Sequence, residues 1–318
     1  MKERKNRDPS RSYRVLEVLG KGSMGSVMKV ERRKTKQSTN ILKMVVSKIA
    51  SCSSVNRKVS SASASALSSV RNHVSSKNHK TDNEEVCFAL KLVHSGGNFN
   101  VSFATELQNE ITILKSLDHP NIVKIMETYD YKKKLYVVME LCSGGDLYAR
   151  DPYTEKDAIK IVKQILSAVA YMHQLNIIHR DLKYENILFE NDSPDADIKV
   201  IDFGLSTKFI QKGAVSFDEH VGTIYSMAPE VFEGLYDSKV DIWAIGVITF
   251  MLLSGQFPFF GKNSTIVRNK ILKNDYNFNG DRWANVSNSA IGFVSCLLEH
   301  NPQQRPTALQ VLQHPFLH

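Results

Sequence analysis

The sequence has few of the features that mark secreted, zinc-binding or membrane-spanning proteins. Only four of its 318 residues are cysteines, and no two of them form a C-x-x-C pair: Cys52, Cys87, Cys142 and Cys296. Neither a disulfide framework nor a zinc site is therefore indicated, and a reducing compartment is expected. The longest apolar run, residues 242–253, is shorter than the roughly 20 residues that a membrane-spanning helix needs, so it predicts a buried helix.

The sequence also lacks a signal peptide and a calcium-binding loop. Residues 1–14 are charged and contain no apolar core, so we expect a soluble protein of the cytoplasm, with the nucleus as a second compartment. No segment matches D-x-[DN]-x-[DN]-G-x5-E, because the acidic stretch with Asp192, Asp195 and Asp197 lacks the glycine and the closing glutamate. We therefore expect no calcium-binding loops in this chain.

A long segment at about 32–83 contains no Phe, Tyr or Trp and is rich in serine. The net charge of the chain is +8, and residues 31–85 supply +7 of it through eleven basic and four acidic residues. Such a segment buries too little apolar surface to offset its ordering entropy, so it predicts a largely disordered insertion, with a short helix at 41–49. The high pI belongs to this insertion rather than to a nucleic-acid-binding fold. Its role stays open between an inert, solvated loop and a site for a docking partner, an anionic surface or phosphorylation.

The rest of the chain has enough apolar residues to fold. With 42% hydrophobic residues, the 318-residue chain can bury a substantial core, as one large domain or as two lobes. Apolar stripes at helical spacing predict helices at 102–117 and 154–175. Short apolar runs predict strands at 86–93 and 135–139.

A polar loop of fixed length stands between two short apolar runs in the middle of the chain. It reads H-R-D-L-K-Y-E-N at 179–186, and a further predicted strand at 198–201 leads into D-F-G at 202–204. The flanking strands should bring Asp181, Asn186 and Asp202 into one cleft. One carboxylate can accept a hydroxyl proton there, while an amide oxygen and a second carboxylate suit Mg²⁺. The alternative, a polar loop without chemistry, does not account for the spacing of the D-F-G segment.

Residues 20–25 form a G-x-G-x-x-G pattern, which two kinds of nucleotide-binding fold share. In a dinucleotide-binding fold the glycines open a helix, whereas here a predicted strand at 27–30 follows them. A strand, a glycine turn and a second strand form a hairpin whose backbone amides approach the phosphates of a nucleotide. Glycine is required because a Cβ atom would block that approach.

Together these motifs resemble the catalytic core of the eukaryotic protein kinases over roughly 13–316, apart from the insertion. The resemblance implies an α+β, bilobal fold with a small antiparallel β-sheet lobe, one long helix in that lobe, and a large, mainly helical lobe. Residues 1–12 would be a tail and 13–317 the kinase domain. Within it, 13–139 would be the small lobe, 140–145 the hinge and 146–317 the large lobe.

The resemblance also implies the cofactors, ATP and Mg²⁺, and the residues around them. Lys91 in the segment A-L-K would bind the α- and β-phosphates, although a surface lysine on an edge strand is the alternative. Glu110 would hold Lys91, with Glu106 as the competitor one turn earlier. The nucleotide site would comprise Leu19, Gly20, Lys21, Gly22, Ser23, Met24, Gly25, Ser26, Val27, Ala89, Lys91, Met139, Glu140, Cys142, Asp146 and Glu185.

In the large lobe, the resemblance assigns Asp181 the role of proton acceptor, while Asn186 and Asp202 would bind Mg²⁺. Lys183 would stabilise the transferring phosphoryl group and mark the serine/threonine class, and Thr223 would contact the Asp181–Lys183 pair. Two supporting contacts are also implied. The backbone of the catalytic loop would donate to Asp241, and Arg305 would pair with Glu230.

Two departures from the kinase pattern lie near the expected substrate groove. Tyr184 replaces the customary proline of the catalytic loop, and residues 224–227 differ from the usual P-x-Y pattern. Asp146 and Glu185 would form an acidic rim, so we expect protein substrates with basic residues near the acceptor. We also expect Glu219 to supply a charge that pairs with Arg180, with Ser216 as the alternative phosphorylation site.

Residues 253–259 and 278–283 look like the calcium/calmodulin-dependent and calcium-dependent kinases, of which this chain would be the catalytic domain only. We therefore expect a serine/threonine protein kinase with a role in signalling. The alternative is a pseudokinase scaffold. Against it, the sequence retains Lys91, Asp181, Asn186 and Asp202.

Overall fold

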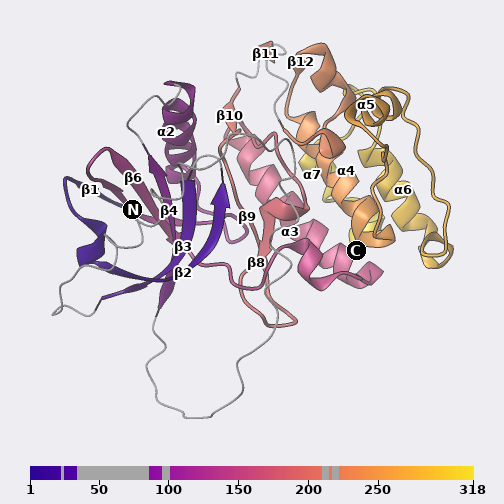
Figure 1. Cartoon of the computed structure of the whole chain (residues 1–318). Coiled ribbons are helices and arrows are strands. Elements are labelled where there is room, and N and C mark those ends of the chain that lie inside the picture. The colour runs from indigo at the N-terminus through magenta and orange to yellow at the C-terminus, as the bar shows by residue number, and fades with distance from the viewer. Residues whose placement is uncertain (23–24, 34–85, 95–100, 210–214, 217–221) are drawn as a thin grey trace. The chain divides into compact units, whose positions relative to one another are not determined.

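The computed structural model describes residues 1–22, 25–33, 86–94, 101–209, 215–216 and 222–318 (Figure 1). The chain divides into two compact units, which we describe separately. Unit 1 comprises Met1–Ala104 and Lys124–Leu141, and unit 2 comprises Thr105–Val123 and Cys142–His318. The predicted insertion and its short helix at 41–49 lie outside the described residues.

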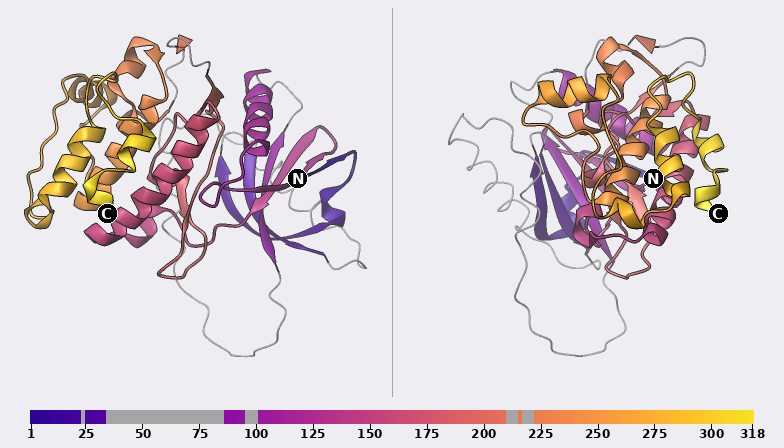
Figure 2. Two further views of the ribbon diagram at one scale, coloured as in Figure 1. Left: turned by 180° about the vertical axis from the view of Figure 1, so that it is seen from behind. Right: turned by 90° about the vertical axis from the view of Figure 1, so that its right-hand side faces the viewer.

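Unit 1 is built on a six-stranded sheet with the strand order β1-β5-β6-β4-β3-β2 (Figures 1 and 2). Every neighbouring pair from β5 to β2 is antiparallel. The strands are β1 (Lys2–Lys5), β2 (Tyr13–Gly22), β3 (Gly25–Arg32), β4 (Cys87–His94), β5 (Ile125–Asp130) and β6 (Lys134–Glu140).

A cluster of apolar side chains covers one face of this sheet. Met28 and Val30 of β3 alternate with more exposed neighbours, as expected for a strand with one buried face. They pack in a cluster with Tyr13. The ring of Tyr13 meets those of Phe88 and Tyr129 edge-on, with centroids 5.7 and 6.2 Å apart. Edge-to-face aromatic contacts stabilise the packing beyond the area that they bury. The core therefore fixes how β2, β3 and β4 lie beside one another.

The expectation of a tail at residues 1–12 is wrong in one respect, because β1 extends the sheet. β1 pairs in parallel with β5, so the sheet is not wholly antiparallel. A polar contact accompanies the pairing: Nε of Arg4 lies 3.1 Å from Oε2 of Glu127, a residue that is only 3% exposed. A polar contact of this kind leaves no apolar periodicity in the sequence, so the pattern of residues 2–5 could not predict the pairing.

The helices of unit 2 follow the predicted apolar stripes. The helix predicted at 154–175 is confirmed as α3 (Glu155–Gln174), and its start is fixed by a capping box between Thr154 and Asp157. The run at 242–253 is confirmed as part of α4 (Lys239–Ser254), which is buried along almost its whole length. A helix that is apolar on all sides must pack on all sides, so α4 forms the centre of the unit.

The remaining helices of unit 2 are short, apart from α2, whose first four residues belong to unit 1. These remaining helices are α2 (Val101–Lys115), α5 (Ser264–Leu272), α6 (Asn288–Leu297) and α7 (Ala308–Val311), with the 3₁₀ turns η4 (Leu147–Arg150), η5 (Tyr184–Asn186), η6 (Ile224–Ser226), η7 (Pro229–Glu233), η8 (Trp283–Asn285) and η9 (Pro315–Leu317). None of the helices among the described residues is long and apolar enough to cross a bilayer.

Three two-stranded ribbons in unit 2 hold its loops in place. They consist of β7 (Ile177–Ile178) with β10 (Thr207–Lys208), β8 (Ile187–Phe189) with β9 (Ile198–Val200), and β11 (Val215–Ser216) with β12 (Leu235–Tyr236). β7 and β8 flank the loop at 179–186, as the sequence predicts. The polar loop therefore begins and ends on paired backbone.

Candidate active site

The loop at 179–186 is anchored from beneath by a buried carboxylate. Oδ2 of Asp241 accepts a hydrogen bond from the backbone N–H of His179 at 3.0 Å, and Oδ1 accepts one from Arg180 at 2.9 Å. The predicted contact of Asp241 with the loop backbone is thus present. Nε2 of His173, at the end of α3, lies 2.8 Å from Oδ2 of the same carboxylate. The sequence did not single out His173, because histidine is common in the last turn of a helix and carries no functional signal there.

The anchor holds the loop in an unusual backbone conformation. Arg180 has a φ of 69°, in the left-handed region that residues with a side chain seldom adopt. The side chain of Arg180 supports this turn from outside, since its Nε donates to the carbonyl of Leu205 at 2.5 Å. Strained residues of this kind persist where the surroundings over-determine them, and they cluster at functional sites.

The pH dependence of the Asp241 anchor follows from its surroundings. Burial by itself would raise the pKa of Asp241, but the hydrogen bonds from His173 and from the loop backbone hold it below its usual value. A carboxylate whose pKa is lowered by folding stabilises the folded state above the unfolded pKa of about 4 and loses that contribution as the pH falls.

We therefore expect Asp241→Asn to lower the free energy of unfolding by about 2 kcal/mol at pH 7, because it weakens charge-assisted hydrogen bonds in a buried site. The difference from the wild type should shrink as the pH is lowered through the carboxyl range. Urea denaturation at pH 7 and at several pH values below about 4 measures this. A difference that stays constant with pH would contradict it.

The catalytic residues assigned from the sequence converge on the carboxylate of Asp181. Its Oδ2 atom lies 2.7 Å from Nζ of Lys183 and 3.0 Å from Nδ2 of Asn186. Its Oδ1 atom accepts hydrogen bonds from N–H and Oγ1 of Thr223, at 3.2 and 3.1 Å. Oγ1 of Thr223 also lies 2.8 Å from the Lys183 ammonium. The predicted contact between Thr223 and the Asp181–Lys183 pair is therefore present.

The approach of Thr223 depends on the glycine before it. Gly222 has a φ of 116°, and a Cβ atom there would lie 2.9 Å from the carbonyl oxygen of Arg180. Only glycine lets the two backbones come this close without strain. Gly222 thus allows a segment more than 40 residues away along the chain to bind the Asp181 carboxylate.

Asp202 stands beside this cluster at the end of β9. The N–H of Ile201 donates to the carbonyl oxygen of Asn186 at 2.9 Å, which ties the two segments together directly before Asp202. Asp202 has a φ of 61° and an exposed side chain, while the next residue, Phe203, is fully buried against the ring of His179. The buried phenylalanine fixes the segment, and the carboxylate before it is left accessible.

The donor set fits the predicted Mg²⁺ site. Nδ2 of Asn186 donates inward to the carbonyl oxygen of Asp181 at 2.8 Å, and the Asn186 amide oxygen accepts no hydrogen bond from a described residue. An accessible carboxylate at Asp202 and this amide oxygen are hard oxygen ligands of the kind that Mg²⁺ prefers. Asn186 and Asp202 could therefore hold the ion.

The nucleotide-site residues assigned to unit 1 lie on neighbouring strands. In the register of the sheet, Val27 of β3 stands opposite Lys91 of β4, and Ala89 of β4 stands opposite Met139 of β6. Gly25 closes the hairpin, and a Cβ atom there would lie only 1.8 Å from the carbonyl oxygen of Leu92. The sheet therefore places the glycine hairpin directly against the strand that carries Lys91.

Some of the assigned residues lie in different units or outside the described residues. Lys91 belongs to unit 1 and Glu110 to unit 2, so their pairing stays a prediction. The side chain of Glu106, the competing carboxylate, and Ser23, Met24 and Glu219 all lie outside the described residues. The same is true of the side chain of Ser216, whose backbone pairs with that of Leu235.

Asp146 and Glu185, the two acids expected at the cleft rim, both influence Tyr148. Oδ1 of Asp146 accepts from the N–H of Tyr148 at 3.0 Å and caps η4, while burial raises the pKa of Asp146 above its usual value. Burial, followed by the nearby Glu185 and Asp146 carboxylates, raises the pKa of Tyr148 to about 12. Both carboxylates therefore act electrostatically on the Tyr148 hydroxyl.

Tyr184, which stands where kinases carry a proline, does not face the substrate groove as expected. Its side chain is only 3% exposed, and its ring packs against that of Tyr148 with centroids 4.9 Å apart. The hydroxyl is buried and finds no hydrogen-bond partner in the described parts of the chain. The departure from the family pattern therefore alters what lies under the loop rather than a surface that a substrate meets.

We expect Tyr184→Phe to raise the free energy of unfolding by about 1 kcal/mol, because a buried hydroxyl without a partner costs about 1–3 kcal/mol. The value of kcat should change little, since the backbone of the loop is unaltered. Chemical denaturation measures the first effect and a peptide phosphorylation assay the second. Tyr148→Phe, at a ring that is 46% exposed, is the matched control with no gain expected.

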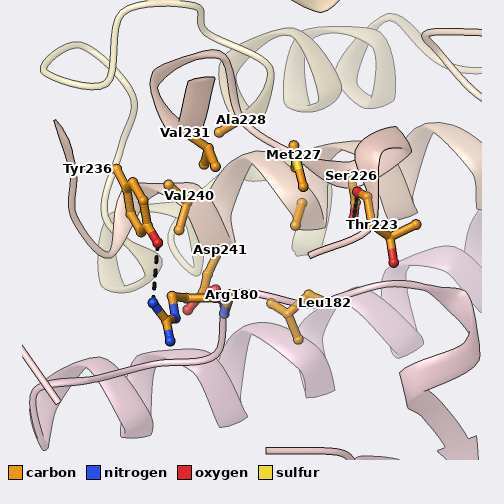
Figure 3. A pocket seen from close by; sticks show the side chains of 11 residues that line it. Arg180, Leu182, Thr223, Ser226, Met227, Ala228, Val231, Tyr236, Val240 and Asp241 are labelled. Carbon is orange, nitrogen blue, oxygen red and sulfur yellow. Dashed lines mark hydrogen bonds between the residues drawn. The ribbon is translucent and has the colours of Figure 1, made fainter. Parts of the chain in front are cut away.

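A small cavity lies behind the catalytic loop, between it, η7 and α4 (Figure 3). Its volume is about 20 Å³, enough for a single water molecule and far too little for a nucleotide. Arg180, Thr223 and Tyr236 line it, and Nη1 of Arg180 donates to the Tyr236 hydroxyl at 3.3 Å across it (Figure 3). Arg180 thus links the catalytic loop to β12.

Comparisons with known proteins agree with this geometry. The family profile described as "Protein kinase domain" matches residues 73–317. Calcium-dependent protein kinase 5 of Plasmodium falciparum (isolate 3D7) is 40% identical over 230 residues, which are 71% of this chain and 40% of that protein. Calcium/calmodulin-dependent protein kinase type 1 of Caenorhabditis briggsae is 41% identical over 216 residues, which are 66% of this chain and 60% of that protein.

A plant protein gives a similar match. Calcium-dependent protein kinase 14 of Arabidopsis thaliana is 42% identical over 217 residues, which are 67% of this chain and 41% of that protein. The chain thus spans between 40% and 60% of the length of these three relatives. The profile match begins at residue 73, beyond β2 and β3, although both strands belong to the same sheet as β4.

Proposed function

Because this chain belongs to the protein kinase family, we propose that it transfers the γ-phosphate of ATP to serine and threonine hydroxyls of protein substrates. One observation carries the proposal: the Asp181 carboxylate is held between the Lys183 ammonium, at 2.7 Å, and the Thr223 hydroxyl, at 3.1 Å. A carboxylate and an ammonium fixed side by side provide a proton acceptor and a positive charge at one point. Both promote phosphoryl transfer to a hydroxyl.

In the proposed reaction, Asp181 orients the substrate hydroxyl and accepts its proton as the oxygen attacks phosphorus. Hydrogen bonds to both carboxylate oxygens fix the direction in which Asp181 points, and it is only 8% exposed. Positioned general bases of this kind contribute about 10²–10⁴-fold to the rate. Nζ of Lys183, which the same cluster holds, stabilises the negative charge on the transferring phosphoryl group.

Asn186 and Asp202 would hold Mg²⁺. When bound, Mg²⁺ neutralises charge across the β- and γ-phosphates. Lys91 and the hairpin around Gly25 would bind the phosphates of ATP from unit 1. The backbone groups of Glu140 and Cys142 would bind the adenine edge.

The acids around Tyr148 support a substrate preference. We expect substrates with basic residues near the acceptor, because Asp146 accepts from the N–H of the half-exposed Tyr148, and Glu185 directly follows Tyr184, whose ring packs on that of Tyr148. Guanidinium and ammonium groups pair with carboxylates and also stack on aromatic faces. A peptide-library assay that selects acidic residues before the acceptor would contradict this preference.

A phosphorylation assay tests the proposed function directly. Bacterially expressed, phosphatase-treated protein should transfer phosphate from MgATP to a basic serine peptide, and phosphoamino-acid analysis should find phosphoserine or phosphothreonine. Separate arms with and without calcium and calmodulin show whether the chain needs either. Protein that binds ATP and phosphorylates neither itself nor the peptide would favour a pseudokinase scaffold instead.

A further inference from the structure

Strand β1 is one margin of the six-stranded sheet of unit 1 (Figure 1). It pairs with β5 in parallel, from Lys2 opposite Glu127 to Lys5 opposite Asp130. Because β1 ends the strand order, its other edge faces no further strand among the described residues. The backbone N–H and C=O groups of an open edge can pair with an additional strand.

Arg4 anchors this edge strand on the sheet. Its Nε and Nη2 atoms lie 3.1 and 3.3 Å from the two carboxylate oxygens of Glu127, and its guanidinium lies over the ring of Tyr129 at 5.7 Å. Burial would raise the pKa of Glu127, but hydrogen bonds from Tyr129 and Arg4, with charge from Arg32, hold it below its usual value. The anchor is therefore charged at neutral pH, and β1 is held in register.

The surroundings of the open edge are strongly basic. A hollow of about 460 Å³ is lined by four basic residues and one acidic residue: Lys2, Glu3, Arg4, Lys5 and Arg7. Of the basic residues, all but Arg4 have exposed side chains. The hollow thus has a net charge of +3 beside backbone groups that can accept a strand. An extended segment rich in carboxylates complements both features.

We propose that the open edge of β1 binds an extended acidic segment of a partner protein as an added, seventh strand. Backbone pairing supplies affinity in this mode of recognition, and side-chain contacts supply specificity. Lys2, Lys5 and Arg7 pair with the acidic side chains of the segment. Lysines on an edge strand also discourage pairing with neutral or basic strands, so the charge of the partner decides which segments bind.

The charges of this chain argue against two other occupants. Residues 31–85 carry a net charge of +7, so the chain's own long insertion is repelled from a basic edge. A second copy of β1 would bring the same basic side chains against those already there. A partner of opposite charge is the occupant that the edge fits.

Fluorescence anisotropy of the full 318-residue chain with a labelled peptide tests the proposal. The peptide alternates glutamate with threonine, and a neutral peptide of alternating serine and threonine should not bind. We expect Lys2→Glu/Lys5→Glu to weaken binding at least about tenfold by introducing like charges at the edge. The matched control is Lys156→Glu/Lys163→Glu, which makes the same change of charge at exposed positions on α3 and should retain most of the affinity. Equal losses in the two variants would overturn the proposal.

Two measurements on the unaltered protein separate strand addition from simple charge attraction. An acidic peptide with proline in place of threonine keeps its charge but lacks half of its N–H groups, so it should bind at least about tenfold more weakly. Binding of the glutamate–threonine peptide should slow amide hydrogen exchange in residues 2–5. The proposal fails if the proline peptide binds equally well. It also fails if residues 2–5 respond only to vesicles of phosphatidylserine, which would assign the basic edge to a membrane surface.

Discussion

Asp181→Asn is expected to lower kcat for peptide phosphorylation by about 10²–10⁴-fold, the range that a positioned general base contributes. Asparagine has nearly the same shape as aspartate, but its amide cannot accept the hydroxyl proton. In the wild type, four donors share the two carboxylate oxygens of Asp181: the Lys183 ammonium, the Asn186 amide, and N–H and Oγ1 of Thr223. Asparagine offers these donors only one oxygen. KM for ATP should change much less than kcat, because the phosphate-binding groups are untouched.

Steady-state kinetics with a basic peptide and ATP measures both constants for the Asp181 variant. Asp192→Asn is the matched control, since Asp192 is exposed in a bend and should leave kcat unchanged. Thermal melting within a few degrees of the wild type shows that the variant is folded. If Asp181→Asn kept more than about a tenth of the wild-type kcat, Asp181 would not be the proton acceptor.

Arg305→Met is expected to lower the free energy of unfolding by about 3–5 kcal/mol, because it strands the buried carboxylate of Glu230. Nη1 and Nη2 of Arg305 lie 2.6 and 3.1 Å from the two carboxylate oxygens of Glu230. Arg305 is 1% exposed and also donates to the carbonyl oxygens of Lys239, Glu299 and His300. The predicted pair is therefore the centre of a larger network that no uncharged side chain can replace.

Urea denaturation of the whole chain measures this loss, and a double variant shows where it comes from. Glu230→Leu/Arg305→Met leaves no buried charge, so we expect it to regain part of the stability that Arg305→Met loses. Arg268→Met, at an exposed position on α5, is the matched control and should cost less than about 1 kcal/mol. A double variant that is less stable than Arg305→Met would contradict the explanation by a stranded charge.

The sequence predicted the centre of the site well because its residues are close together in the chain. The loop at 179–186 carries Asp181, Lys183 and Asn186 within eight positions, so two flanking strands suffice to place them. The helices at 154–175 and 242–253 were equally predictable, since apolar periodicity reports directly on burial. Contacts such as Arg305 with Glu230 came from the family resemblance rather than from any local pattern.

Other features had no local signal. The pairing of β1 with β5 is accompanied by a contact from Arg4 to a glutamate more than 120 positions away, and such a contact leaves no periodicity in residues 2–5. Tyr184 was visible as a departure from the proline of the family, but its burial depends on Tyr148 from another turn. His173 became meaningful only beside Asp241. In each case tertiary packing decides what a single residue does.

The register of β3 and β4 has a practical consequence for protein engineering. Glu31 and Cys87 are partners across these two strands, so the chain leaves the sheet and returns to it at adjacent points. The entropy of closing such a loop grows only with the logarithm of its length, by roughly 0.6 kcal/mol per doubling. A compact reporter domain whose own termini lie close together could therefore be exchanged for residues 34–85, with the hairpin and Lys91 left in their places.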